Sequence, residues 1–398
     1  MFRSNFQRTG VYNTTGIRQL KGLKWKLDRS NLIFIFFDCG LTVADSILCL
    51  GNWDGNLYGL DVRTGKEVWQ YRVGESYPFS PNFFNSNTVV DGTVYISNIP
   101  LNSDRENLTA IDLQTGREKW QFTNQFPTVD VSNRNFLNPI SVAVANGVVY
   151  FPSGDGNLYS LDAVSGDRIG YFRTTKNMPL SHLAVKDNIV CVYSNDGYLY
   201  AIDTVTQQQL WKFEIGGILS AIALVPVIAN NKVYIVVNTK IIYAIDLETG
   251  AEVWNFTLEK ARFSQPAITD RFVCLVNNND LYVLNSETGE IIWTLSLENY
   301  LSYFSLSGPV IANNIIYVSG ANCLQAIDLD TQEKLWEFKS PSSEFWELKF
   351  WFDLNGEILN KFEPNYPKSF DFFSIPVIAD GIIYVGSAYG SLYALEGF

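Results

Sequence analysis

The sequence predicts an all-β fold, an eight-bladed β-propeller of four-stranded antiparallel blades. Three observations predict it: one motif recurs along the 398-residue chain, its copies are spaced like propeller blades, and the two chain ends supply complementary parts of one copy. The motif's clearest copy is Gly55 to Trp69, GNLYGLDVRTGKEVW, and its fixed points are Tyr, an acid, Thr-Gly and Trp. Self-similarity of this kind is the signature of a repeat architecture.

The acidic position of the motif counts the units. It is filled in turn by Asp61, Asp112, Asp162, Asp203, Asp246, Asn285, Asp328 and Glu396. Most intervals lie near about forty to fifty residues, which suits a blade of four short strands joined by tight turns. Asp-Gly pairs such as Asp155-Gly156 supply the positive φ angles that a two-residue hairpin turn requires. Each unit is therefore predicted to be a β-meander.

The chain ends predict how the ring closes. The last copy stops at LYALE, residues 392–396, before reaching a Trp strand of its own. Residues 23–28, LKWKLD, carry Trp25 and are expected to supply that missing strand by pairing with the C-terminal blade. The prediction is one propeller domain over residues 1–398. A closed ring leaves no open sheet edge to pair with another chain, so we expect a monomer.

The repeated Trp is interpreted as a structural residue that packs between neighbouring blades. The positions are Trp25, Trp69, Trp120, Trp211, Trp254, Trp293 and Trp336. Blade three departs from the pattern, because Gly170 stands where Trp belongs. Gln207 and Gln332 replace the turn Gly in blades four and seven. We expect a softer contact between blades beside Gly170.

The stretch from Asp54 to Trp69 and the opening MFRSNFQRTGVY resemble the PQQ-like repeat propellers, and the resemblance covers nearly the whole chain. That family includes a propeller lipoprotein of the outer-membrane β-barrel assembly machinery and quinoprotein alcohol and glucose dehydrogenases. The shared residues are packing and turn residues. The resemblance therefore implies the fold, and any chemistry must come from other positions.

Composition disfavours several classes of partner and site. The net charge is −12 and no long run of Lys or Arg is present, so phosphate backbones are repelled and nucleic acid is not an expected partner. No apolar stretch is long enough to span a bilayer. A single His rules out a His-based triad or a two-His metal site within one chain, and no CxxC motif offers a zinc site. We expect no catalytic residue and no metal.

The quinoprotein dehydrogenases of the family carry an adjacent Cys pair, a calcium site and a catalytic Asp over the quinone. This chain has five separated Cys. Cys49, Cys191 and Cys274 align with Tyr of other blades and are predicted core residues, whereas Cys39 and Cys323 remain as free thiols. The repeat Asp residues are interpreted as hydrogen-bond acceptors in turns. No cofactor is expected, and PQQ with calcium belongs only to the alternative of a quinoprotein oxidoreductase.

Two features lie outside the repeat. His182 falls at the start of an inner strand of blade four, where it could face the central channel, although a structural role is favoured. An aromatic-rich insertion at 340–374 precedes the last blade, and loops on a rigid scaffold commonly carry function. The insertion either covers a propeller face or presents its aromatic side chains to a partner. The candidate partner-binding residues are Phe345, Trp346, Phe350, Trp351 and Phe352.

The sequence thus favours a noncatalytic binding scaffold whose rim loops and central funnel bind a protein or peptide. The resemblance implies a role in envelope or outer-membrane protein assembly. The N-terminus lacks the basic, apolar and small-residue regions of a secretory signal. Two locations stay open: the periplasm or envelope if a leader precedes this sequence, and the cytoplasm otherwise.

Overall fold

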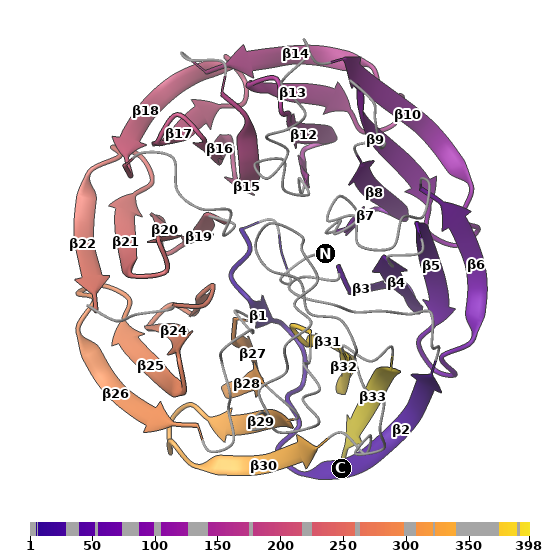
Figure 1. Ribbon diagram of the computed structural model, residues 1–398, viewed down its shortest axis with the longest axis vertical. Coiled ribbons are helices and arrows are strands. Elements are labelled where there is room, and N and C mark those ends of the chain that lie inside the picture. The colour runs from indigo at the N-terminus through magenta and orange to yellow at the C-terminus, as the bar shows by residue number, and fades with distance from the viewer. Residues whose placement is uncertain are drawn as a thin grey trace, which may run out of the picture.

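The computed structural model describes the segments that carry the repeat. They are residues 5, 7–28, 40–51, 55–73, 87–98, 105–125, 142–174, 178–216, 225–258, 263–297, 308–320, 323–339, 374–387 and 391–398. The regular elements of these segments are strands, and they form eight sheets arranged around a central axis (Figure 1). The predicted eight-bladed β-propeller is confirmed.

Each blade is an antiparallel meander that runs from the axis to the rim. Blades 1 to 4 are β3 (Thr42–Ala44), β4 (Ile47–Gly51), β5 (Asn56–Asp61), β6 (Glu67–Arg72); β7 (Thr88–Val90), β8 (Thr93–Asn98), β9 (Arg105–Asp112), β10 (Glu118–Gln125); β11 (Ala143–Ala145), β12 (Val148–Pro152), β13 (Asn157–Asp162), β14 (Arg168–Arg173); and β15 (Leu180–Lys186), β16 (Ile189–Ser194), β17 (Tyr198–Asp203), β18 (Gln208–Glu214). Blades 5 to 8 are β19 (Val227–Ala229), β20 (Lys232–Val237), β21 (Ile241–Asp246), β22 (Glu252–Thr257); β23 (Ala267–Ile268), β24 (Phe272–Asn277), β25 (Asp280–Asn285), β26 (Ile291–Ser296); β27 (Val310–Ala312), β28 (Ile315–Ser319), β29 (Cys323–Asp328), β30 (Lys334–Lys339); and β31 (Val377–Ala379), β32 (Ile382–Gly386), β33 (Ser391–Gly397) with β2 (Leu20–Asp28).

The ring closes between the two ends of the chain as predicted. Strand β2 pairs antiparallel with β33, which sets Trp25 opposite Ala394 and Lys26 opposite Tyr393. The closing strand is longer than the predicted 23–28, because it begins at Leu20. Ordinary ladder pairing between an N-terminal and a C-terminal strand therefore makes the eighth blade four-stranded.

The N-terminal segment before β2 takes a path that the repeat does not predict. Strand β1 (Val11–Tyr12) lies parallel to β27 and makes blade 7 five-stranded. Upstream of it, backbone carbonyls of the segment accept N–H groups at the inner strands of three successive blades. These bonds are Ile228 N–H to Gln7 O, Ile268 N–H to Thr9 O and Ile311 N–H to Gly10 O, each 2.8 Å. The segment therefore runs across the inner ends of blades 5, 6 and 7 (Figure 1).

The contact between the outer strand of one blade and the β-turn of the next, called a seam below, is built around the repeated Trp. In five seams the indole N–H donates to the carbonyl oxygen of the residue that follows the repeat acid of the next blade. The pairs are Trp25 to Val62, Trp69 to Leu113, Trp120 to Ala163, Trp211 to Leu247 and Trp254 to Ser286, at 2.8 to 3.1 Å. Each indole thus joins two blades by a hydrogen bond as well as by packing.

The turn Gly of the motif is required by the indole above it. Gly116 has a φ of +67°, and a Cβ there would lie 2.7 Å from the Trp69 ring. A side chain would therefore meet both an unfavourable backbone conformation and the indole. The same close approach occurs at Gly65, Gly166, Gly250 and Gly289.

Three seams depart from this arrangement, and in one of them the indole N–H of Trp336 donates to the carbonyl oxygen of Ile17 at 2.7 Å. Where Gln332 replaces the turn Gly, the indole N–H of Trp293 has no recorded hydrogen bond to a described residue, although its ring is buried. At the seam between blades 3 and 4, Gly170 replaces the indole itself and Gln207 replaces the turn Gly. The end of the Gln207 side chain lies where a Cβ of residue 170 would be.

The cysteines predicted to lie in the core do so. Cys49, Cys191 and Cys274 are fully buried on the second strand of their blades, and burial raises the pKa of each thiol. Cys323 is buried as well, and Cys39 lies outside the described residues. None of the described thiols is in a disulfide.

The seam predicts a large stability difference between two adjacent residues of β6. Replacing Trp69 with Ala removes the indole, its hydrogen bond to blade 2 and its contact with Gly116, so we expect the free energy of unfolding to fall by roughly 3 to 5 kcal/mol. Val68 is 50 % exposed, and Val68→Ala should change it by less than about 1 kcal/mol. Chemical denaturation of both variants makes the comparison, and equal losses would contradict the assignment.

Candidate functional site at the central channel

The repeat acids are committed to the turns between the third and fourth strands. The Asp61 carboxylate accepts the backbone N–H of Thr64 at 2.8 Å and its hydroxyl at 2.6 Å, which keeps the pKa of Asp61 below its usual value. The bond from Thr249 does the same at Asp246, where the backbone N–H is the largest cause of the lowered pKa. These acids hold their turns closed, as the sequence predicts.

His182 is buried at the inner edge of blade 4. It lies on β15 and is 5 % exposed. Burial lowers its pKa to about 3, and the nearby positive charge of Arg8 adds to the effect. The ring is therefore neutral at physiological pH. No described residue forms a hydrogen bond with its Nδ1 atom.

Arg8 reaches this place because the N-terminal segment folds across the channel side of the ring. Its backbone has a φ of +61°, and its N–H donates to the carbonyl oxygen of Asn5 at 3.1 Å. The Asn5 side chain in turn donates to the Thr9 hydroxyl at 2.7 Å. Arg8 is 3 % exposed. The structure thus brings together a buried cation and the chain's single His, a pairing that the sequence does not reveal because residues 5–12 lie outside the repeat.

The described inner strands do not suit a quinone held by calcium. Calcium is bound by oxygen ligands, mainly carboxylates. Within the described residues, the innermost strands β3, β7, β11, β15, β19, β23, β27 and β31 contain no Asp or Glu. A carboxylate ligand for such a cation would therefore have to come from other segments of the chain.

A second polar group lies farther from the axis, between blades 2 and 3. Glu106 is 1 % exposed, and one carboxyl oxygen accepts the Ser153 hydroxyl at 2.8 Å. Burial raises the pKa of Glu106 to about 8. Asp155 accepts hydrogen bonds from Asn124 and Tyr159 in the same network. Sequence reasoning missed Glu106, because nothing in its spacing shows that a blade interface would cover it.

The insertion lies outside the described residues. Phe345, Trp346, Phe350, Trp351 and Phe352 therefore remain predictions. Within the described ranges, no helix is long and apolar enough to cross a membrane.

The family model described as outer membrane protein assembly factor BamB matches residues 22–255 and 176–397. The chain belongs to this family. The two matched ranges together include every blade and the closing strand, so membership extends over the whole ring.

Curated relatives of this BamB-family chain match over parts of it. A serine/threonine-protein kinase, AfsK of Streptomyces griseus, is 28% identical over 142 residues, which is 36% of this chain and 16% of the kinase. A quinohemoprotein alcohol dehydrogenase of Comamonas testosteroni is 36% identical over 84 residues, or 21% of this chain and 12% of the dehydrogenase. The matches thus span well under a fifth of either relative's length.

Solved structures are similar in fold over nearly the whole chain. BamB from Moraxella catarrhalis has a TM-score of 0.59 at 16% identity, covering 94% of this chain and 99% of that one. A europium-containing methanol dehydrogenase has a TM-score of 0.64 at 11% identity, covering 100% and 97%. At these identities the likeness shows the propeller fold alone.

The environment of His182 predicts an unusual titration. Because the chain has one His, its ring protons give a single set of resonances that needs no assignment by mutation. We expect the Cε1–H chemical shift in ¹H NMR to stay constant between about pH 5 and 8, where a solvated imidazole would titrate. The lowered pKa also means that this group reduces stability as the pH falls from 6.5 toward about 3. A midpoint near 6.5 in the folded protein would contradict the buried placement.

Proposed function

We propose that this chain is a noncatalytic scaffold that binds a protein or peptide partner during assembly of outer-membrane proteins, and that it acts in the envelope. The family carries the assembly role. The observation that carries the noncatalytic part is the N-terminal segment, which runs across the inner ends of blades 5 to 7 and places Arg8 beside His182. Part of the inner surface of the ring is thus covered by the chain itself.

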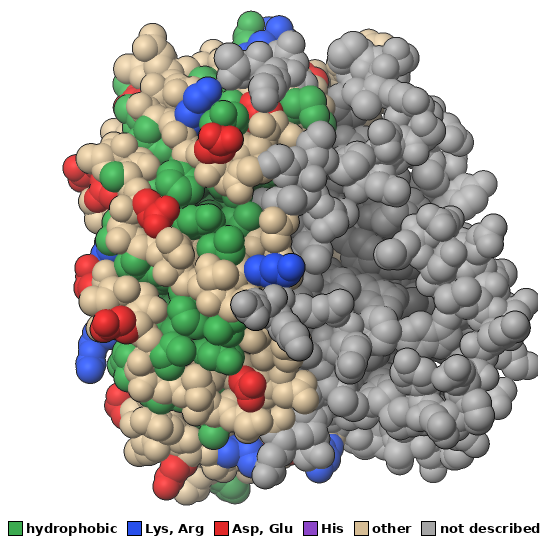
Figure 2. All heavy atoms as spheres, turned by 60° about the vertical axis from the view of Figure 1, so that its left-hand side comes forward, with side chains coloured by type: hydrophobic (Ala, Val, Ile, Leu, Met, Phe, Trp, Pro, Cys, Tyr) green, Lys and Arg blue, Asp and Glu red, His purple; other side chains and the backbone are tan. Residues whose placement is uncertain are grey.

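The rim supports a binding role. In five blades the residue before the repeat Trp position is an apolar side chain that is 44 to 55 % exposed. These residues are Val68, Ile169, Leu210, Val253 and Ile292. Figure 2 shows hydrophobic side chains between acidic and basic ones over the described side of the molecule. Apolar positions repeated around a rigid ring offer anchor points to a partner.

The second candidate is a PQQ-dependent oxidoreductase, and the match to the quinohemoprotein alcohol dehydrogenase favours it. The donor set of the described inner strands argues against it. Our proposal therefore includes no cofactor and no catalytic residue.

The function test replaces both insertion Trp residues with Ala. We expect Trp346→Ala/Trp351→Ala to abolish recovery of the partner after in vivo crosslinking in the native host, because large aromatic side chains dominate binding energy at interfaces. The melting temperature should stay within about 2 °C of the wild type, as for a surface substitution. Phe398→Ala, which removes an exposed aromatic side chain at the C-terminus, is the control and should retain the partner.

Two results would contradict the proposal. One is saturable, dye-linked oxidation of an alcohol or sugar by the purified chain supplied with PQQ and calcium, measured beside a known quinoprotein dehydrogenase. The other is recovery of the same partner at wild-type levels by the double variant. A collapse of the melting temperature would assign both Trp residues to the protein core and refute their role in binding.

A further inference from the structure

The seam between blades 3 and 4 lacks the indole that the other blades supply. Gly170 of β14 stands at the Trp position, and a Cβ there would collide with the Gln207 amide. The Gln207 side chain therefore lies in space that the indole fills elsewhere. Its backbone keeps a φ of +54°, in the left-handed region that favours glycine.

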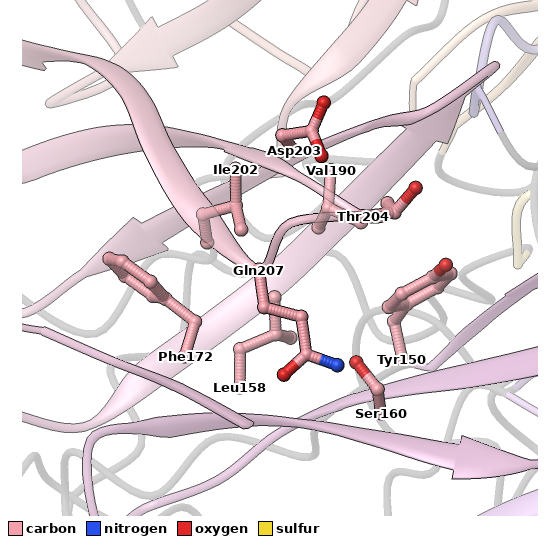
Figure 3. A pocket seen from close by; sticks show the side chains of 9 residues that line it. All are labelled: Tyr150, Leu158, Ser160, Phe172, Val190, Ile202, Asp203, Thr204 and Gln207. Carbon is pink, nitrogen blue, oxygen red and sulfur yellow. The ribbon is translucent and has the colours of Figure 1, made fainter. Parts of the chain in front are cut away.

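The aromatic partner of the missing indole is still present. In four seams a Tyr of the second strand packs against the Trp, with ring centroids 5.8 to 5.9 Å apart. The pairs are Tyr384 with Trp25, Tyr95 with Trp120, Tyr234 with Trp254 and Tyr317 with Trp336. Tyr150 occupies the same position on β12 of blade 3. Its ring faces the seam without a Trp (Figure 3).

The hydrogen-bond acceptor for an indole is present too. Thr204 follows the repeat acid Asp203, so its carbonyl corresponds to those that accept the indole N–H in five other seams. Among the described residues, no donor is recorded for the Thr204 carbonyl oxygen and no hydrogen bond is recorded for the Gln207 side-chain amide. The Thr204 carbonyl oxygen is therefore available to accept a hydrogen bond from a ligand. The Gln207 side chain breaks no such hydrogen bond to a described residue when a ligand displaces it.

These groups surround a small cavity of about 10 Å³, roughly the room for one water molecule, beside the Gln207 side chain. Its walls include Tyr150, Leu158, Ser160, Phe172 and Ile202, and the Gln207 side chain points between Leu158 and Ser160 (Figure 3). Apolar and aromatic walls with a few placed polar groups are the usual composition of a ligand site.

The surface at this seam is also more apolar than at its equivalents. Tyr171 follows Gly170 and is 48 % exposed, and Val205 lies in the blade 4 turn and is 74 % exposed. The first position is polar in other blades, at Gln70, Gln121, Lys212 and Asn255, whereas the second is apolar at Val164 of blade 3 as well. The apolar residue at the first position therefore coincides with the seam that lacks its indole.

We propose that this seam binds a tryptophan side chain of a partner polypeptide, whose indole displaces Gln207, packs on Tyr150 and donates its N–H to the Thr204 carbonyl. The chain's other seams define the shape and chemistry of this ligand. The inference rests on the proposed scaffold function and adds to it the place and the kind of residue that is recognised.

The test measures binding of N-acetyltryptophanamide by saturation-transfer NMR titration to three forms of the full chain. Gln207→Gly opens the pocket, and we expect binding about tenfold tighter than to the wild type, as for removal of a competing side chain. Gly170→Trp/Gln207→Gly fills the pocket with the chain's own indole. We expect this double variant to lose binding and to melt at a higher temperature, because the seam between blades 3 and 4 then contains an indole like the regular seams.

Controls keep the outcomes separate. If the double variant fails to fold by circular dichroism, Gly170→Leu/Gln207→Gly serves as the filled form. Equal binding to all forms, no binding to Gln207→Gly, or equal binding of N-acetylphenylalaninamide would overturn the inference. If no form binds N-acetyltryptophanamide but the partner is still recovered by crosslinking, the seam site alone is refuted. Quinone-dependent oxidation by the purified chain would refute the scaffold function, whatever the result of the titration.

Discussion

The structure depends on the contact between an indole and the turn of the next blade. A closed ring of eight sheets requires every neighbouring pair to meet at a similar spacing and angle, because an error at one seam cannot be released at an open edge. The Trp fixes this contact in two ways: its ring fills the outer part of the seam, and in five seams its N–H donates to the equivalent carbonyl oxygen. Gly beneath the ring and an acid-closed turn around that carbonyl complete the unit. The motif therefore consists mainly of the residues that form the seam.

The seam contact is also made where the two ends of the chain meet, at blade 8. Blade 8 has no turn joining its last two strands, because β33 is the C-terminal strand and β2 the N-terminal one. The indole of Trp336 still finds a carbonyl, that of Ile17, at 2.7 Å. Arg18 pairs with the blade 7 acid Asp328 at 2.6 Å. The N-terminal segment thus substitutes for the missing turn before it forms the closing strand, and its earlier residues lie across the inner ends of three blades. One N-terminal segment therefore both closes the ring and covers part of its inner surface.

The fold could be predicted from the sequence because its determinants recur. The spacing of the acid, Thr-Gly and Trp gave the number of blades, and the incomplete last copy gave the pairing of residues 23–28 with the C-terminal blade. Residues 7–19 could not be placed in this way, because they lie outside the repeat and their backbone hydrogen bonds to the inner strands leave no side-chain pattern. The neighbourhood of Arg8 and His182 depends on that placement, and the burial of Glu106 depends on the packing of blade 2 against blade 3. The sequence shows Gly170 and Gln207 as two separate departures from the motif. Only the structure shows that these two residues face each other across one seam.

Hydrogen exchange of the Trp indole N–H groups, followed by NMR under native conditions, tests the central claim most directly. If each indole joins two blades of one closed ring, the N–H of Trp25, which bridges the chain ends, should be protected as strongly as that of Trp120 in the middle of the chain, since both open only when the whole ring opens. Rapid exchange at Trp25 beside slow exchange at Trp120 would show that the eighth blade opens by itself, and the account of closure would be wrong.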